Sequence, residues 1–382
     1  MKNARSIVSA GAILFLVMVL SGCGLFGPKT ETIIIPSEEE GQRVDKDFQP
    51  FQVKKIYRLP EEFTSAGQLL GWSGPRAVVA SSRKISTPES MFLNRLTYPY
   101  EKSEWIPGIK ADSPNIELSP DGKNLSEIST TASGTVLKMI SLEDGKETEI
   151  AKFRFSEQVF PQDATWSNNS RYLCYLAIDP RERGNARISV YDIHNQTSKT
   201  YPLTGLAGGK TLIKINVSDD GQSVLLTTMQ WGQSGRMNMI MMGTVKANAI
   251  EIQYEHQIGR EQIAWVNNDQ CVFSGTDGTL YVYDRRNGEL SVLLEKVGEF
   301  DLSRDRKNIA YSLYNQDTIY AGKIQGKNVL FNEPVYHGLI PSQVFWSPDN
   351  NSLLIYGQKF YSPSQNTQPN ATDGQSLIIE FQ

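Results

Sequence analysis

Few residues in this chain have the types and spacing that a reactive site needs. Its three histidines, His194, His256 and His337, show no His-x-x-x-His spacing, and His194 stands in a predicted turn where solvent exposure is expected. The Gly-x-Ser-x-Gly motif of a serine nucleophile is absent, and residues 274–278 (Ser-Gly-Thr-Asp-Gly) have the composition of a hairpin turn. The linear sequence therefore predicts no catalytic residue, no metal ligand set and no cofactor.

A glycine-rich segment ends in Gly209-Lys210-Thr211, as phosphate-binding loops do. Thr204 occupies the position of the first glycine in that motif, and the segment lies between two predicted strands rather than between a strand and a helix. We therefore predict no nucleotide. The chain has 38 Lys and Arg against 42 Asp and Glu, and this near-neutral balance also argues against a nucleic-acid partner.

Cys23 is the residue for which the sequence does predict a covalent reaction. Lys2 and Arg5 precede an apolar run of 14 residues (7–20), which is shorter than the ~20 residues of a membrane-spanning helix. The run ends in Leu20-Ser21-Gly22-Cys23, which resembles the lipobox of bacterial lipoproteins. The sequence predicts cleavage after residue 22 and a diacylglycerol on the Cys23 sulfur; an ordinary signal peptide or a signal anchor is the alternative.

This processing predicts a location and a domain order. Two acyl chains hold a protein stably on a membrane, so we expect it to be lipid-anchored at the extracytoplasmic face of the cell membrane. Loss of Lys2 and Arg5 changes the formal charge from −4 to −6. Residues 1–22 are then the signal peptide, residues 23–50 a lipidated and flexible tether, and residues 51–382 the folded domain.

The folded domain contains a repeat. A Trp-Ser-Pro-Asp type of unit precedes an apolar run at intervals of 37–51 residues, and an apolar residue stands seven positions after each anchor residue. Serine follows the anchor directly in six of seven units, and Asp or Asn stands three positions after it in six of seven. The anchors are Trp72, Leu118, Trp166, Val217, Trp265, Leu302 and Trp346.

The composition of each unit predicts short strands joined by tight turns. Pro-Asp-Gly and Asn-Asn between apolar runs are turn sequences, and Val, Ile and Tyr are concentrated in the runs. Four short strands in each repeat of about 45 residues, without helical periodicity, predict an all-β propeller. We expect seven four-stranded blades, with six as the alternative, and residues 53–59 as the outermost strand of the last blade, closing the ring.

Residues outside the repeat pattern are the candidates for ligand contact. Trp105 and Trp231 are not anchors, and Trp231 stands in a polar, glycine-containing connection. Exposed aromatic side chains suit peptide or glycan contacts, whereas the alternative is a ring folded back onto its blade. Residues 358–376 are a longer Ser-, Asn- and Gln-rich loop, either a binding appendage or a mobile segment. Cys174 and Cys271 fall in non-adjacent repeats, so we expect two buried free thiols.

The units Trp346-Ser347-Pro348-Asp349 and Leu118-Ser119-Pro120-Asp121-Gly122 resemble the repeats of the TolB-like (WD40-like) β-propellers. Together with the lipobox they resemble the bacterial YqgU-like propeller lipoproteins, over roughly residues 53–382. TolB-like propellers commonly have six blades, and the second domain of TolB has no counterpart here.

The resemblance implies fold and location but no reaction. We expect a non-catalytic propeller that binds a protein, peptide or cell-envelope ligand. The alternative is a propeller enzyme of the lyase, glycosidase or lactonase type, with Asp, Glu and Tyr side chains at the mouth of the channel. A cluster of carboxylates at one mouth would favour the enzyme, and an exposed aromatic or charged patch would favour the binding protein.

Overall fold

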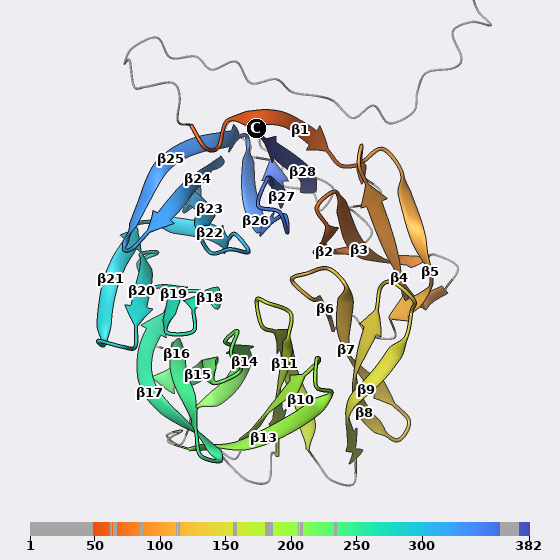
Figure 1. Cartoon of the computed structure of the whole chain (residues 1–382), viewed down its shortest axis with the longest axis vertical. Helices are drawn as coiled ribbons and strands as arrows, with labels where there is room; N and C mark the ends of the chain where they lie inside the picture. Colours follow the sequence, from red (N-terminus) through yellow and green to blue (C-terminus); the bar gives the residue numbers. More distant parts are fainter. Residues whose placement is uncertain are drawn as a thin grey trace, which may run out of the picture.

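The computed structural model describes residues 49–61, 63, 67–84, 87–111, 113, 115–155, 159–179, 186–204, 206, 209–232, 235–359 and 374–382. Strands account for nearly all of the regular structure in these residues, and they form five four-stranded sheets and one eight-stranded sheet. The sheets are arranged in a ring around a central axis (Figure 1). The predicted signal peptide, Cys23 and most of the tether lie outside the described residues.

Each four-strand unit begins at the axis and runs outward in antiparallel order. The first sheet has β2 (Gly67–Gly74), β3 (Ala77–Lys84), β4 (Thr87–Thr97) and β5 (Ser103–Ala111). The second sheet has β6 (Ile116–Leu118), β7 (Asn124–Thr131), β8 (Gly134–Ser141) and β9 (Glu147–Arg154). Two further four-stranded sheets follow later in the chain. One has β18 (Ile263–Asn267), β19 (Gln270–Ser274), β20 (Leu280–Asp284) and β21 (Glu289–Leu294). The other has β22 (Val297–Leu302), β23 (Asn308–Leu313), β24 (Thr318–Gln325) and β25 (Asn328–His337).

The eight-stranded sheet lies between these pairs and comprises the third and fourth repeats. Its first half has β10 (Phe160–Trp166), β11 (Tyr172–Ile178), β12 (Ala186–Asp192) and β13 (Thr197–Thr204). Its second half has β14 (Thr211–Val217), β15 (Ser223–Gly232), β16 (Gly235–Lys246) and β17 (Ala249–Ile258). The outermost strands β13 and β17 pair in parallel through only two residue pairs, Leu203 with Ile250 and Thr204 with Glu251.

The prediction of an all-β propeller with four-stranded blades is therefore confirmed. The count of seven separate blades is not shown, because the third and fourth repeats share one sheet through β13 and β17. Edge strands present unpaired backbone groups, so two edges within reach of each other pair readily. The sequence pattern, which records side-chain alternation, carries no signal for this backbone contact.

The N-terminal strand closes the ring, as the sequence predicts. The last sheet has the order β1 (Val53–Arg58), β28 (Gly374–Phe381), β27 (Ser352–Lys359) and β26 (Leu339–Trp346). β1 pairs antiparallel with β28 from Val53 opposite Phe381 to Arg58 opposite Leu377. The first strand of the chain is thus the outermost strand of the final sheet (Figure 1).

The repeated serine and carboxylate or amide pair forms a common turn after five of the innermost strands. Each serine hydroxyl donates to an Asp or Asn oxygen two residues later at 2.6–2.7 Å and accepts from the backbone amide five residues later at 2.8–2.9 Å. These buried serines are Ser119, Ser167, Ser218, Ser303 and Ser347. The repeat therefore preserves a hydrogen-bonded turn.

The anchor tryptophans join neighbouring sheets at the axis. The indole nitrogens donate to a backbone carbonyl on the innermost strand of the preceding unit: Trp72 to Phe345 at 3.0 Å, Trp166 to Glu117 at 3.3 Å and Trp346 to Asp301 at 3.2 Å. The indole nitrogen of Trp265 is buried without a hydrogen-bond partner in the described part of the chain. Three of the four anchor tryptophans thus combine burial with a directional bond between units.

This difference predicts unequal effects of the same substitution. Trp72→Phe removes a buried bond between units, whereas Trp265→Phe removes a comparable ring area without a bond. Because a net hydrogen bond contributes about 1 kcal/mol, we expect Trp72→Phe to lower the free energy of unfolding by about 1 kcal/mol more than Trp265→Phe. Equilibrium urea denaturation measures both. Equal losses would contradict the role of the indole bond.

Candidate functional site

Residues of the innermost strands and their turns line two cavities that share Glu117. The inner-strand cavity, of about 320 Å³, is lined by residues that include Asn115, Glu117, Asp163, Lys214 and Gln262. The turn-side cavity lies where the innermost strands end in the serine turns. Its volume is about 330 Å³, and Glu117 lines it as well. Glu117 therefore lies at the junction of the two cavities.

Two carboxylates from adjacent units meet in the inner-strand cavity. The Glu117 side chain on β6 contacts the cavity, but the surrounding strands remove much of its bulk solvent, and this desolvation raises its pKa to about 8. The charge of Asp163 raises the pKa further, and the charge of Lys214 lowers it. Burial also raises the pKa of Asp163 on β10, against the effect of a 2.8 Å hydrogen bond from the backbone amide of Ile215. At neutral pH Glu117 is therefore mostly protonated and can donate a hydrogen bond.

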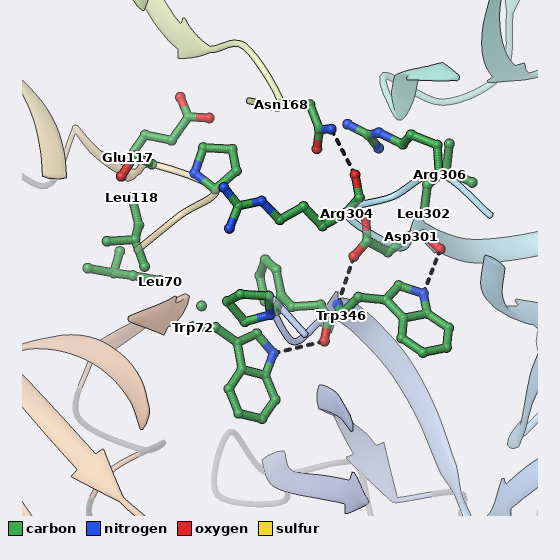
Figure 2. Close-up of a pocket in the computed structure, with 15 residues that line it drawn as sticks. Leu70, Trp72, Glu117, Leu118, Asn168, Asp301, Leu302, Arg304, Arg306 and Trp346 are labelled. Atoms are coloured by element: carbon green, nitrogen blue, oxygen red, sulfur yellow. Dashed lines mark hydrogen bonds between the residues drawn. The ribbon is translucent and has the colours of Figure 1, made fainter. Parts of the chain in front are cut away.

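The turn-side cavity contains the opposite balance of charge. Asp301 on β22 accepts a hydrogen bond from the backbone amide of Trp346 at 3.0 Å (Figure 2). Burial raises the pKa of Asp301 to about 6, opposed by that bond and by the charge of Arg306. Arg304 and Arg306 both line the cavity. Near neutral pH two guanidinium groups therefore face one ionised carboxylate and the mostly protonated Glu117.

The two arginines come from one turn that departs from its four counterparts. Ser303-Arg304-Asp305-Arg306 stands where other repeats have sequences such as Ser119-Pro120-Asp121-Gly122. Arg306 has a φ of +61°, the left-handed conformation that Gly122, Ser170, Gly221 and Asn350 adopt in the other turns. That conformation costs a residue with a side chain of this size about 1–2 kcal/mol. The turn itself does not require an arginine there, since glycine or asparagine forms the same turn.

A hydrogen bond crosses the channel at the turn-side cavity. The side-chain amide of Asn168, in the turn between β10 and β11, donates to the backbone carbonyl of Arg304 at 3.0 Å. The backbone amide of Arg304 donates to Asn350 Oδ1, also at 3.0 Å, in the turn between β26 and β27. The Arg304 backbone is thus held from two sides, and its side chain extends toward the Glu117 side of the cavity (Figure 2).

The sequence did not identify these charged residues, although a signal for them exists. Glu117 and Asp301 both stand immediately before an anchor residue, and Arg304 stands two positions after one. Aligning the repeats and asking which units depart from the common residue at these positions would have found Arg304 and Arg306.

The two tryptophans chosen from the sequence lie well apart around the ring. Trp105 is on β5 with 44% of its surface exposed, and its ring packs edge-on against Phe92 at 5.5 Å between centroids. Trp231 is 76% exposed near the end of β15. It lies in a strand rather than in an irregular connection, and neither tryptophan lines the central cavities.

The β15–β16 hairpin that carries Trp231 extends beyond its sheet. Met229 is the last residue of β15 that pairs with β14, and Asn238 is the first residue of β16 that pairs with β17. Residues 230–232 and 235–237 pair only with each other, with Trp231 opposite Arg236. Arg236 forms a 3.0 Å ion pair with Glu261, which also lines the inner-strand cavity. The projecting tip therefore lies beside one end of the channel.

The other residues singled out from the sequence have structural partners. Lys210 of the glycine-rich segment pairs with Glu255 at 2.6 Å. His256 stacks on Tyr254, and His337 Nδ1 lies 2.9 Å from the Thr318 hydroxyl. Cys174 and Cys271 are buried and free, as expected, and burial raises the pKa of both thiols.

The described residues contain neither a cluster of metal-ligating side chains nor a membrane-spanning helix. No three His, Cys, Asp or Glu side chains there gather closely enough to hold a metal ion. No helix in the same part of the chain is long and apolar enough to cross a membrane. Of the predicted loop 358–376, residues 360–373 lie outside the description.

Comparison with solved structures matches the chain to β-propeller proteins. No protein-family model and no curated protein sequence matches it. An oligogalacturonate lyase in complex with manganese matches with a TM-score of 0.55 and 12% identity, over 93% of this chain and 98% of that chain. The propeller domain of the Trilobed protease from Pyrococcus furiosus matches with a TM-score of 0.52 and 12% identity, over 82% and 93%. The tricorn protease matches with a TM-score of 0.45 and 15% identity, over 70% of this chain but 30% of that chain. At these identities the likeness establishes the fold alone.

The raised pKa of Glu117 predicts a pH-dependent stability. The folded state binds the proton more tightly than the unfolded state, so ionisation of Glu117 destabilises the fold as the pH rises from about 4.5 to about 8. Glu117→Gln stays neutral. We expect it to match the wild type at pH 5 and to be more stable at pH 9 by about 1–2 kcal/mol, a discounted figure because the side chain contacts cavity solvent.

Urea denaturation at pH 5, 7 and 9 measures this difference. Glu104→Gln, which alters an exposed carboxylate on β5, serves as the control and should show no gain at pH 9. A Glu117→Gln variant that gains nothing over wild type between pH 5 and pH 9 would show that Glu117 ionises freely in the channel.

Proposed function

We propose that this chain is a lipoprotein of the YqgU-like propeller kind, anchored at the extracytoplasmic face of the cell membrane through a diacylglycerol on Cys23. Its propeller binds a protein, peptide or cell-envelope ligand and catalyses no reaction. The lipobox ending at Cys23 supports the anchor. We also propose that the ring functions as seven blades, because β10–β13 and β14–β17 each follow one anchor residue and are joined by only two residue pairs.

The observation that carries the binding function is the projecting β15–β16 hairpin. A large aromatic side chain that is 76% exposed loses favourable burial unless it contacts something else. Arg236 lies opposite Trp231 in the strand register, and exposed Trp and Arg are the residue types that dominate binding energy at interfaces. The tip is therefore a contact surface for a partner.

The anchor is tested by Cys23→Ala. Without the thiol no thioether can form, so the variant should leave the membrane fraction or be mislocalised when cells are fractionated. Cys174→Ala, which removes a buried thiol in β11, is the matched control and should remain in the membrane fraction. Unchanged membrane retention of Cys23→Ala would contradict the lipid anchor.

The contact surface is tested by placing a photoreactive phenylalanine analogue at position 231 in the full chain in living cells. The expected result is a discrete cross-linked adduct at position 231. Val292 on β21, 51% exposed, provides the control position and should give none. Identical adducts at both positions, or none at either, would argue against a contact at the hairpin tip.

A second function is favoured by the carboxylate pair in the channel. Glu117, with a pKa of about 8, retains a proton near neutral pH, and Asp163 lies in the same cavity, so together they provide an acid and a base of the kind that propeller enzymes use. One structural neighbour is an oligogalacturonate lyase. Cleavage of an acidic polysaccharide by wild type but not by Glu117→Gln would favour this function over binding.

A further inference from the structure

The turn between β22 and β23 places two positive charges, Arg304 and Arg306, in the lining of a cavity without a salt-bridge partner among the described residues. Among the described residues, no ion pair or hydrogen bond involves the guanidinium group of Arg304 or Arg306; the hydrogen bonds of Arg304 to Asn168 and Asn350 use its backbone. Five other arginines each form an ion pair with a carboxylate: Arg171, Arg236, Arg260, Arg285 and Arg286. The guanidinium groups of both arginines line the turn-side cavity. A confined and unpaired guanidinium is costly unless something supplies the missing negative charge.

The backbone conformation of Arg306 strengthens this observation. Glycine or asparagine would form the turn at lower cost, because a φ of +61° is unfavourable for a side chain as large as arginine. Strain kept at a position that the fold does not need is a mark of a functional residue. The facing turns have neutral residues at the matching position: Gly122, Ser170, Gly221 and Asn350.

The remaining wall of the cavity defines what it accommodates. Leu70, Leu118 and Phe345 form an apolar side, and Asp301 is occupied by the backbone amide of Trp346. Near neutral pH the lining carries Arg304 and Arg306 against Asp301, since Glu117 is mostly protonated; Asp219 also acts on Arg306. Pro120, Asn168 and Pro348 at the mouth are half-buried, so the cavity meets solvent there.

We propose that the turn-side cavity is an anion-binding site, in which Arg304 and Arg306 hold the carboxylate or phosphate of a small molecule whose body lies against the apolar side. A guanidinium donates paired N–H groups whose geometry matches both oxyanions. The site goes beyond the proposed contact at Trp231, because Trp231 does not line this cavity.

The test measures binding of three probes to the purified full chain at pH 7 by isothermal titration calorimetry, with ionic strength held constant by sodium chloride. The probes are inorganic phosphate, glucuronate and the neutral sugar glucose. We expect at least one of the two oxyanions to bind and glucose not to bind. Phosphate alone, or glucuronate alone, identifies which oxyanion the site selects, and binding of both shows a site for either.

Three variants assign the binding to the cavity. Arg304→Gln and Arg306→Asn should each weaken oxyanion binding roughly tenfold or more, the loss expected for a charged hydrogen bond. Arg306→Asn should fold normally, since Asn350 holds the same turn position at a φ of +62°. Lys307→Gln removes one positive charge from the same turn, outside the cavity lining, and should bind like wild type.

The proposal is overturned if neither oxyanion binds, or if glucose binds with the same affinity as the oxyanion that binds. It is also overturned if both arginine variants bind the oxyanion like Lys307→Gln. Trp231→Ala should leave oxyanion binding unchanged. If no cross-linked adduct forms at position 231 but the oxyanion still binds, the proposed partner surface is contradicted and the anion-binding site is still supported.

Discussion

The candidate site depends on hydrogen bonds that join the innermost strand of one unit to that of the next at several junctions of the ring. The indoles of Trp72, Trp166 and Trp346 reach the preceding unit, whereas the carboxylates of Asp163 and Asp301 reach the following one. The innermost strands vary in length, from three residues in β6 to eight in β2 and β26. At these junctions the side-chain bonds position one innermost strand against the next, together with the buried apolar side chains that pack between neighbouring sheets.

This arrangement explains why the candidate site contains carboxylates that also have structural partners. Asp301 orders the Trp346 backbone and faces the cavity, so its negative charge serves the fold and sets the charge balance of the site. Glu117 differs, because its carbonyl accepts the Trp166 indole while its carboxyl group faces the cavities. The Glu117 backbone is thus held by a hydrogen bond while its carboxyl group stays available to a ligand. Such an arrangement holds a reactive or ligand-binding group in place.

The repeat made the fold predictable, since the same anchor, serine and Asp or Asn recur and each has one physical role. Ring closure by β1 could also be predicted, because the last repeat lacks a strand and an extended segment precedes the first. The joined sheet was not predictable: Leu203 and Ile250 are ordinary core residues of their own strands, so nothing in their sequence marks the backbone pairing between the two repeats. The raised pKa values of Glu117 and Asp301 could not be predicted from the sequence, since the strands that desolvate these carboxylates meet around the axis only in the folded chain.

The pairing of β1 with β28 also determines the order in which the molecule can be completed. Lys54 and Glu380, joined by a 2.7 Å ion pair, are separated by 326 positions in the chain. Because the chain is synthesised from its N-terminus, residues 53–58 stay unpaired until residues 377–381 have been synthesised. Such a distant contact is formed slowly, and the open edge of the final sheet is exposed meanwhile. The pairing of β1 with β28 therefore protects the sheet edge in the folded ring, whereas the same edge is open to aggregation while the chain is being synthesised.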